Sequence, residues 1–245
     1  MSFAYNNMIN VIGDIMAQYK IAVDAGHGGS DYGATYNGRA EKDDNLKLAL
    51  AVGDILEKNG IDVVYTRTTD EYETPFKKAT DANDAKADYF VSIHRNSSPT
   101  PNQYTGVETL VYNNSGIKSQ MAANINSELE KAGFKNLGIT ERPNLVVLKR
   151  TKMPAVLVEA GFINNDKDNE TFDKNFNQIA NGIADGILKT LGIKPKTNNT
   201  TAQAASGEVP SVKSDSARSA EIMPAAYEKK PAPPAKPACN CDDDL

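Results

Sequence analysis

Two histidines are the residues of this chain best suited to chemistry, and the 245 residues contain no others. His27 lies in a glycine-rich loop after the apolar run 21–23, and His94 follows the apolar run 89–93. Reacting groups in open α/β proteins gather where strands end and loops begin. Neutral imidazole suits zinc, and a catalytic zinc typically has three protein ligands and one open position. The pair therefore indicates a metal site, although either histidine alone would more often be a hydrogen-bonded structural residue.

The third ligand of such a site is expected to be a carboxylate, because the two cysteines lie in the C-terminal tail. Several carboxylates could serve. Glu41 follows the glycine-containing loop 28–38, which is long enough to bring it back beside His27. Glu41 also precedes an expected helix, where a negative charge favours the helix dipole. Spacing alone therefore leaves both interpretations of Glu41 open.

A further carboxylate, Glu159, follows the apolar run 155–158. Burying an idle charge is costly, so a functional role is favoured over a structural one. The structural alternative is an ion pair with a base such as Arg67. We find no Ser-His or Cys-His arrangement typical of a covalent nucleophile, so water is the expected nucleophile.

Strand and helix patterns alternate between residues 20 and 194. This order predicts a single α/β domain with a mostly parallel twisted sheet and helices on both faces. Strand patterns or short apolar runs occupy residues 21–23, 61–66, 89–93, 107–112, 146–148 and 155–158, and helical patterns occupy residues 43–58, 76–87, 116–132 and 172–191.

The two ends of the chain differ from this domain. Residues 1–19 contain apolar side chains at helical spacing over 8–19, which predicts a helical extension. Packing on the domain is favoured over membrane or partner binding, because the helix has no cationic face. Residues 195–245 are rich in Pro, Ala and Ser and cannot bury enough surface to offset their ordering entropy, which predicts a disordered tail. Cys239 and Cys241, one residue apart in this tail, are interpreted as solvated thiols.

Charge and hydropathy exclude other classes of protein. The net charge of -5 argues against nucleic-acid binding, which usually needs a basic face. No stretch has the roughly 18 consecutive apolar residues of a membrane span. The apolar run at 8–12 is short and no Lys or Arg precedes it, so it does not read as a signal peptide. Export would need another route, or the chain lacks its natural start.

Five stretches in order resemble the zinc-dependent N-acetylmuramoyl-L-alanine amidases of the Amidase_3 type, over residues 20–191. They are Val23-Asp24-Ala25-Gly26-His27-Gly28-Gly29, Glu41-Lys42, Val64-Tyr65-Thr66-Arg67, Ser92-Ile93-His94-Arg95-Asn96 and Val158-Glu159-Ala160-Gly161-Phe162-Ile163. The resemblance implies one zinc ion held by His27, Glu41 and His94. It implies Glu159 as the catalytic base, which takes a proton from water and gives it to the leaving amine.

The substrate implied by the resemblance is bacterial peptidoglycan. The bond is the amide between the lactyl group of N-acetylmuramic acid and L-alanine of the stem peptide. We expect a monomer that acts at the cell wall and is released by phage lysis or another non-classical route. A non-catalytic wall-binding module and a zinc hydrolase of another amide are the alternatives, and products from a wall digest separate them.

Three features depart from the pattern of the family. Residues 77–83 carry lysines where many relatives have an arginine before the Ala-Asn pair. Arg95 follows His94 where a small residue is common, and we expect Arg95 and Asn96 to contact substrate. The short segment 97–106 stands where regulated relatives carry a long inserted helix that blocks the site. This predicts that the chain lacks such self-inhibition.

Overall fold

The computed structural model describes residues 19–195. The helix expected over 8–19 and the tail expected over 195–245 lie outside the described residues, apart from Tyr19 and Pro195. A six-stranded sheet forms the centre, in the order β4-β1-β5-β8-β6-β7. All neighbouring strands are parallel except β6 and β8, so the predicted mostly parallel sheet is confirmed. The strands are β1 (Lys20–Ala25), β4 (Asp62–Tyr65), β5 (Tyr89–Asn96), β6 (Val107–Val111), β7 (Asn136–Glu141) and β8 (Ala155–Phe162).

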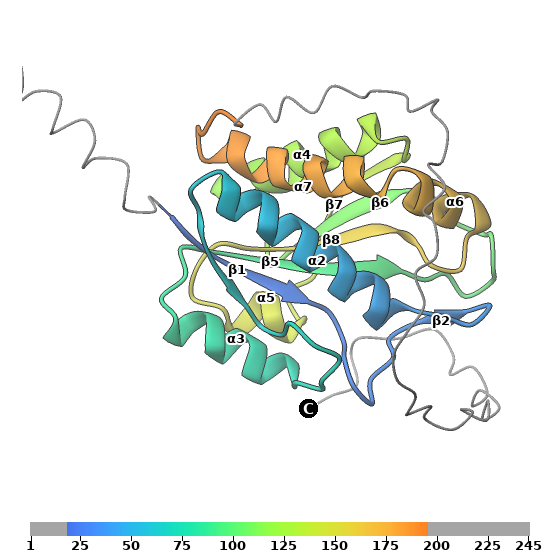
Figure 1. The fold of residues 1–245 in the computed structure, drawn as a ribbon, viewed down its shortest axis with the longest axis horizontal. Coiled ribbons are helices and arrows are strands. Elements are labelled where there is room, and N and C mark those ends of the chain that lie inside the picture. Colours follow the sequence, from blue (N-terminus) through green and yellow to red (C-terminus); the bar gives the residue numbers. More distant parts are fainter. Residues whose placement is uncertain (1–18, 196–245) are drawn as a thin grey trace, which may run out of the picture. The chain divides into compact units, whose positions relative to one another are not determined.

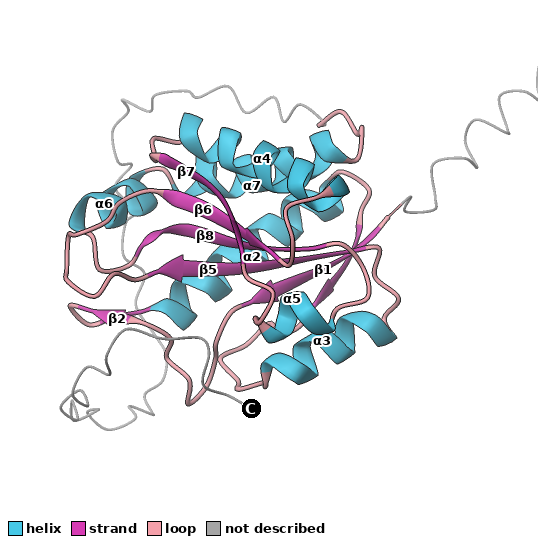
Figure 2. Cartoon of the chain, turned by 180° about the vertical axis from the view of Figure 1, so that it is seen from behind, coloured by secondary structure: helices cyan, strands magenta, loops and turns pink. Residues whose placement is uncertain are grey.

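Helices cover both faces of the sheet (Figure 1). Figure 2 shows the same layers from behind. One face carries α2 (Glu41–Lys58), α4 (Gly116–Lys131) and α7 (Phe176–Thr190), and the other carries α3 (Pro75–Asp84) and α5 (Val146–Arg150). The remaining elements are α6 (Asp166–Lys174) and a hairpin of β2 (Thr35–Tyr36) and β3 (Arg39–Ala40). Between residues 19 and 195, no helix has the length and apolar character needed to cross a membrane.

Side-chain alternation along the strands divides the core into two parts. Val91, Ile93 and Val158 join a large buried cluster with α2, α4 and α7. Phe90 and Leu157 join a smaller cluster with α3 and α5. Successive side chains of a strand point to opposite faces. His94 and Glu159 therefore emerge on the face that carries α3 and α5.

The structure departs from the predicted elements in a few places. The helix predicted over 172–191 is two helices, α6 and α7, because Asn175 between them has a non-helical backbone (φ -111°, ψ 21°). The apolar run 146–148 begins the short helix α5. Strand β7 gave no sequence signal, since it contains Gly138 at φ 94° and few β-branched residues.

A buried ion pair fastens α3 to the sheet beneath His27. The carboxylate of Asp24, 1% exposed, accepts hydrogen bonds from Ser92 and Thr66, both at 2.6 Å. Lys78 Nζ lies 2.9 Å from the same carboxylate and donates to the carbonyl oxygen of Ala25 at 2.6 Å. Burial raises the pKa of Asp24, but Lys78 and the two hydroxyls outweigh it and hold that pKa below its ordinary value. Asp24 is therefore buried as an anion.

Replacing Lys78 should destabilise the protein strongly. Lys78→Met leaves the Asp24 carboxylate without its cation, which we expect to lower the free energy of unfolding by about 3–5 kcal/mol at pH 7 in a urea titration. Because the pKa of Asp24 is lowered by folding, the stabilisation is present above about pH 4 and is lost as the pH falls through the lowered value. Acidification should therefore destabilise the wild type more than the variant.

The matched control is Lys77→Met, which removes a lysine 54% exposed in its side chain from the same helix. Its ion pairs with Glu73 and Asp81 lie at the surface, so the loss should stay below about 1 kcal/mol. If both substitutions lower the free energy of unfolding equally, the buried ion pair of Lys78 with Asp24 contributes no more to stability than an ion pair at the surface.

Candidate active site

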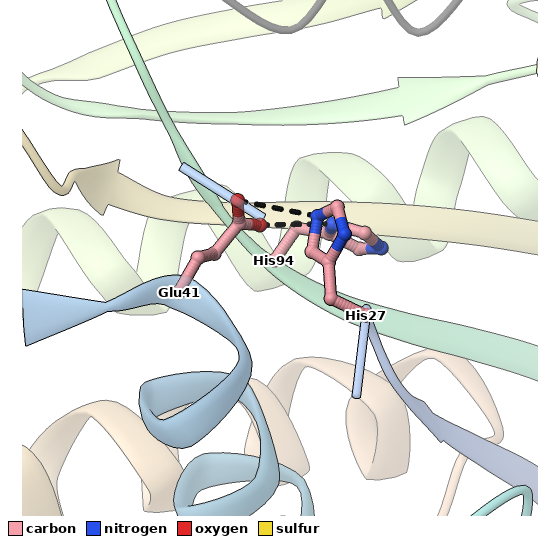
Figure 3. Close-up of side chains that lie close together, drawn as sticks. All are labelled: His27, Glu41 and His94. Carbon is pink, nitrogen blue, oxygen red and sulfur yellow. Dashed lines mark hydrogen bonds and ion pairs between the residues drawn. The ribbon is translucent and has the colours of Figure 1, made fainter. Parts of the chain in front are cut away.

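Three potential metal ligands converge at one end of the sheet. His27 lies in the loop after β1, Glu41 is the first residue of α2, and His94 lies on β5. Their ligand atoms all lie within 4.8 Å of one another, and Figure 3 shows both imidazoles directed at the Glu41 carboxylate. His27 Nε2 is 3.2 Å from Glu41 Oε2, and His94 Nδ1 is 3.0 Å from Glu41 Oε1. Ligands of a tetrahedral zinc ion lie about 3.3–3.6 Å apart, so this cluster can hold a metal ion.

Glycines make room for the cluster. A Cβ atom on Gly26 would lie 2.3 Å from the imidazole of His94. One on Gly33 would lie 2.6 Å from both Glu41 Oε2 and the His27 ring. His27 itself has φ 59°, a left-handed conformation that is costly for a residue with a side chain. The glycine-rich loop is thus required by the close approach of the three ligands.

Asp31 orients the imidazole of His27. Its Oδ2 lies 2.7 Å from His27 Nδ1, which leaves Nε2 directed at Glu41. Histidine ligands of metals usually donate their other ring N–H to such a group. Sequence reasoning missed Asp31, although a carboxylate four residues after a candidate ligand in the same loop was an available signal.

Glu41 is 3% exposed and its carboxylate is surrounded by donors. Oε2 accepts from the backbone N–H of Ala34 at 2.9 Å, and Oε1 accepts from the backbone N–H of Arg95 at 3.1 Å. Burial raises the pKa of Glu41, but the charge of His27 and hydrogen bonds from both histidines hold it well below its ordinary value. Burial lowers the pKa of His27, but Glu41 and Asp31 outweigh it and raise that pKa far above its ordinary value. The negative charges of Glu41 and Asp31 thus favour the protonated form of His27.

Glu159 lies beside this cluster on β8, in register with His94 of β5. Its Oε2 atom is buried and has no hydrogen-bond partner among the residues that the structure describes. Burial and the neighbouring carboxylates Glu41 and Glu108 raise the pKa of Glu159 well above its ordinary value. The guanidinium of Arg67 instead donates to backbone carbonyls, including that of Ala25 at 3.0 Å. A structural ion pair between Glu159 and Arg67 is therefore excluded.

Comparison with known proteins agrees with the resemblance drawn from the five motifs. Residues 21–189 match the family Amidase_3, described as N-acetylmuramoyl-L-alanine amidase. The chain belongs to this family. The match lies inside the predicted domain of residues 20–194.

Similar proteins include phage, sporulation and cell-wall amidases. The endolysin of Bacillus phage SPP1 is 37% identical over 185 residues, which cover 73% of this chain and 68% of the endolysin. The sporulation-specific N-acetylmuramoyl-L-alanine amidase of Bacillus subtilis (strain 168) is 38% identical over 187 residues, which cover 74% of this chain and 71% of that amidase. The catalytic domain of the amidase CwlV from Bacillus (Paenibacillus) polymyxa var. colistinus superposes with a TM-score of 0.67 at 37% identity. That superposition covers 72% of this chain and 100% of the CwlV domain.

Within this Amidase_3 domain, Arg95 does not line the site, and its predicted contact with substrate is wrong. The Arg95 side chain is 0% exposed and points to the opposite face of β5 from His94. Its Nη1 lies 2.6 Å from Asp44 Oδ2, Nη2 donates to Asn169 at 2.8 Å, and the guanidinium lies over the Phe172 ring at 4.1 Å. The error arose because neighbours in a strand face opposite sides of the sheet. Arg95 instead joins β5 to α2 and α6.

Asn96 shares the face of His94, so its predicted contact with substrate stays a prediction. Its Nδ2 donates to Glu108 Oε1 at 2.7 Å, and Glu108 Oε2 accepts from Thr140 Oγ1 at 2.8 Å. Glu108 was missed by sequence reasoning, although a carboxylate inside the apolar run of β6 was a usable signal. The segment 97–106 joins β5 to β6 without a helix, while the absence of self-inhibition stays a prediction.

Removing the carboxylate that orients His27 should weaken metal binding. Asp31→Asn keeps the shape of the side chain but removes its charge. We expect the affinity for zinc to fall about 10- to 100-fold, measured by competition with a chromogenic chelator. Asp54→Asn, the same change on the exposed face of α2, should leave the affinity unaltered. Equal affinities of wild type and Asp31→Asn would show that Asp31 does not contribute to metal binding.

Proposed function

We propose that this chain is a zinc-dependent hydrolase that cleaves the amide between N-acetylmuramic acid and L-alanine in bacterial peptidoglycan. Membership of the amidase family supports the reaction and its substrate. The observation that carries the metal-dependent chemistry is the convergence of His27, Glu41 and His94 beside Glu159, whose buried Oε2 has no partner within residues 19–195. This substrate places the action of the protein at the bacterial cell wall. A monomeric state and release by lysis remain predictions.

Two imidazoles and one carboxylate are a donor set typical of catalytic zinc. His27, Glu41 and His94 would hold the ion, and a fourth position would remain for water or substrate. When bound, zinc acidifies water and polarises a carbonyl group. A proton on His27 would have to leave when the ion binds, because a metal ligand has to be deprotonated.

Glu159 is proposed as the general base and then as the general acid. Its carboxylate takes a proton from the attacking water and delivers it to the amide nitrogen as the C–N bond breaks. Hydrolysis yields the carboxylic acid on the lactyl side and the amine of L-alanine, and transfer of the acid proton to the amine leaves a carboxylate and an ammonium group. A raised pKa suits both roles, since proton transfer works best when the pKa of the group lies near the operating pH.

Substitution of Glu159 tests its role as the base. Glu159→Gln preserves the shape of the side chain but cannot accept the proton, so we expect hydrolysis to slow at least about 100-fold with zinc still bound. Mass spectrometry of the products from purified peptidoglycan measures the rate of hydrolysis, and metal analysis measures the zinc content. Glu130→Gln on α4 is the matched control. Normal digestion by Glu159→Gln would show that another group is the base.

The wild-type digest also tests the reaction itself. Stem peptides with a free L-alanine amine identify the proposed bond. Products cut at another amide would indicate a different specificity, and no products would indicate a wall-binding module without activity.

Loss of a ligand and a change of pH test the proposed metal site. His94→Ala should lose zinc and activity together, and an excess of chelator should do the same to the wild type. Because the pKa of His27 is raised in the metal-free protein, zinc must displace a proton, so its affinity should increase with pH between 6 and 8. Calorimetry in buffers of different ionisation enthalpy counts the released protons. An affinity that does not change over this range would contradict the proposed ligand set.

A further inference from the structure

Glu108 extends the row of functional groups beyond Glu159. In the antiparallel pair of β6 and β8, Glu108 is directly opposite Glu159, and in the parallel pair of β8 and β5, Glu159 is opposite His94. The three side chains therefore lie in one row across neighbouring strands, on the face that carries α3 and α5. Figure 1 shows β5, β8 and β6 as successive strands of the sheet. The row runs from the metal ligands, past Glu159, to Glu108.

The carboxylate of Glu108 is held in place on both of its oxygen atoms. Asn96 donates to Oε1 at 2.7 Å from β5, and Thr140 donates to Oε2 at 2.8 Å from β7. Strands on either side of Glu108 thus fix its orientation. The residue is half-buried, so a ligand in the site can still reach it.

Glu108 lies directly opposite a second carboxylate, that of Glu159. Like charges at close range repel, and Glu108 stands beside Glu159. Among residues 19–195, no lysine, arginine or histidine forms an ion pair with Glu108. Its two hydrogen-bond partners, Asn96 and Thr140, are neutral donors, and the charge of Arg142 acts on the neighbouring Glu159 without forming an ion pair with Glu108. A half-buried carboxylate that is held by two neutral donors and forms no ion pair is suited to bind a positively charged group of a ligand.

The proposed reaction produces a positively charged group, the ammonium group of L-alanine, on one side of the site. The amide carbonyl faces His27, Glu41 and His94, and the amide nitrogen receives its proton from Glu159. The amine side of the substrate therefore extends from Glu159 away from the metal ligands. β6 is the next strand in that direction, and Glu108 is its residue in the same row.

We propose that Glu108 belongs to the amine-side subsite, where its carboxylate accepts a hydrogen bond from the α-amino group of the departing peptide. This inference rests on the proposed function and adds a residue that binds the leaving group. A neutral amide N–H is a weaker donor than the ammonium group formed after cleavage. Glu108 should therefore bind the product amine more tightly than the uncut amide.

The test compares two synthetic peptides that begin with L-alanine, one with a free amine and one N-acetylated, bound to the zinc-loaded full chain. A hydrogen bond to a charged group should make the wild type prefer the free amine by roughly 10-fold or more in calorimetry at pH 7. Glu108→Gln should abolish this preference. Glu141→Gln removes one charge from an exposed position on neighbouring β7 and should retain it.

Two further measurements separate binding from loss of structure. Glu108→Gln should keep its zinc and unfold at the same or a higher urea concentration than the wild type, because a like-charge repulsion has been removed. Thr140→Val keeps the charge but frees one oxygen of Glu108, so a smaller loss of preference is expected. An unchanged preference in Glu108→Gln, or a wild type without any preference, would overturn the assignment.

These outcomes are distinct from a failure of the proposed function. If the wild type releases no stem peptides with free L-alanine from peptidoglycan, the proposed reaction is wrong. If it releases them while Glu108→Gln binds both peptides as the wild type does, the reaction stands and only the role of Glu108 is rejected.

Discussion

The buried carboxylate of Glu41 is the group on which the rest of the site depends. An ionised carboxylate at 3% exposure is tolerable only when partners surround it. Those partners come from four parts of the chain: His27 after β1, Ala34 in the following loop, Asn45 on α2 and the β5 residues His94 and Arg95. Satisfying one charge therefore brings the glycine-rich loop, the start of α2 and the end of β5 to the same point. A divalent cation held by His27, Glu41 and His94 would balance the charge of this carboxylate.

The loop that carries His27 is held by buried cations that donate to its carbonyl oxygens. Lys78 donates to Ala25 and His27, Arg67 to Ala25 and Gly26, and Lys42 to Gly29. These bonds give a reason for a left-handed His27 to persist, since a strained conformation survives only when its surroundings over-determine it. The cation of Lys78 thus both compensates Asp24 and supports the loop.

Sequence patterns sufficed for the parts of the fold that depend on local hydrophobicity. Apolar runs located the strands that present His27, His94 and Glu159, and the resemblance to the amidases selected Glu41 where spacing left two interpretations. The predicted contact of Arg95 with substrate was wrong because Arg95 follows His94 in the sequence but not in the site. A step of one residue along a strand turns the side chain to the other face of the sheet. Glu108 could not be connected to Glu159, because no local pattern reveals that β6 runs antiparallel to β8. Partners across strands depend on topology, which single-sequence patterns specify poorly.

The unequal covering of the two faces explains how the sheet can carry these charges. The face with α2, α4 and α7 buries the larger apolar cluster, which supplies most of the hydrophobic stabilisation. The opposite face buries a smaller cluster under α3 and α5, and its strand ends carry His94, Glu159 and Glu108 in place of apolar side chains. Each like-charge contact there costs stability, and a domain is stable by only about 5–15 kcal/mol in total. The large apolar cluster on the other face therefore offsets the cost of these charges, and it does so although that face also buries the ion pair between Arg95 and Asp44.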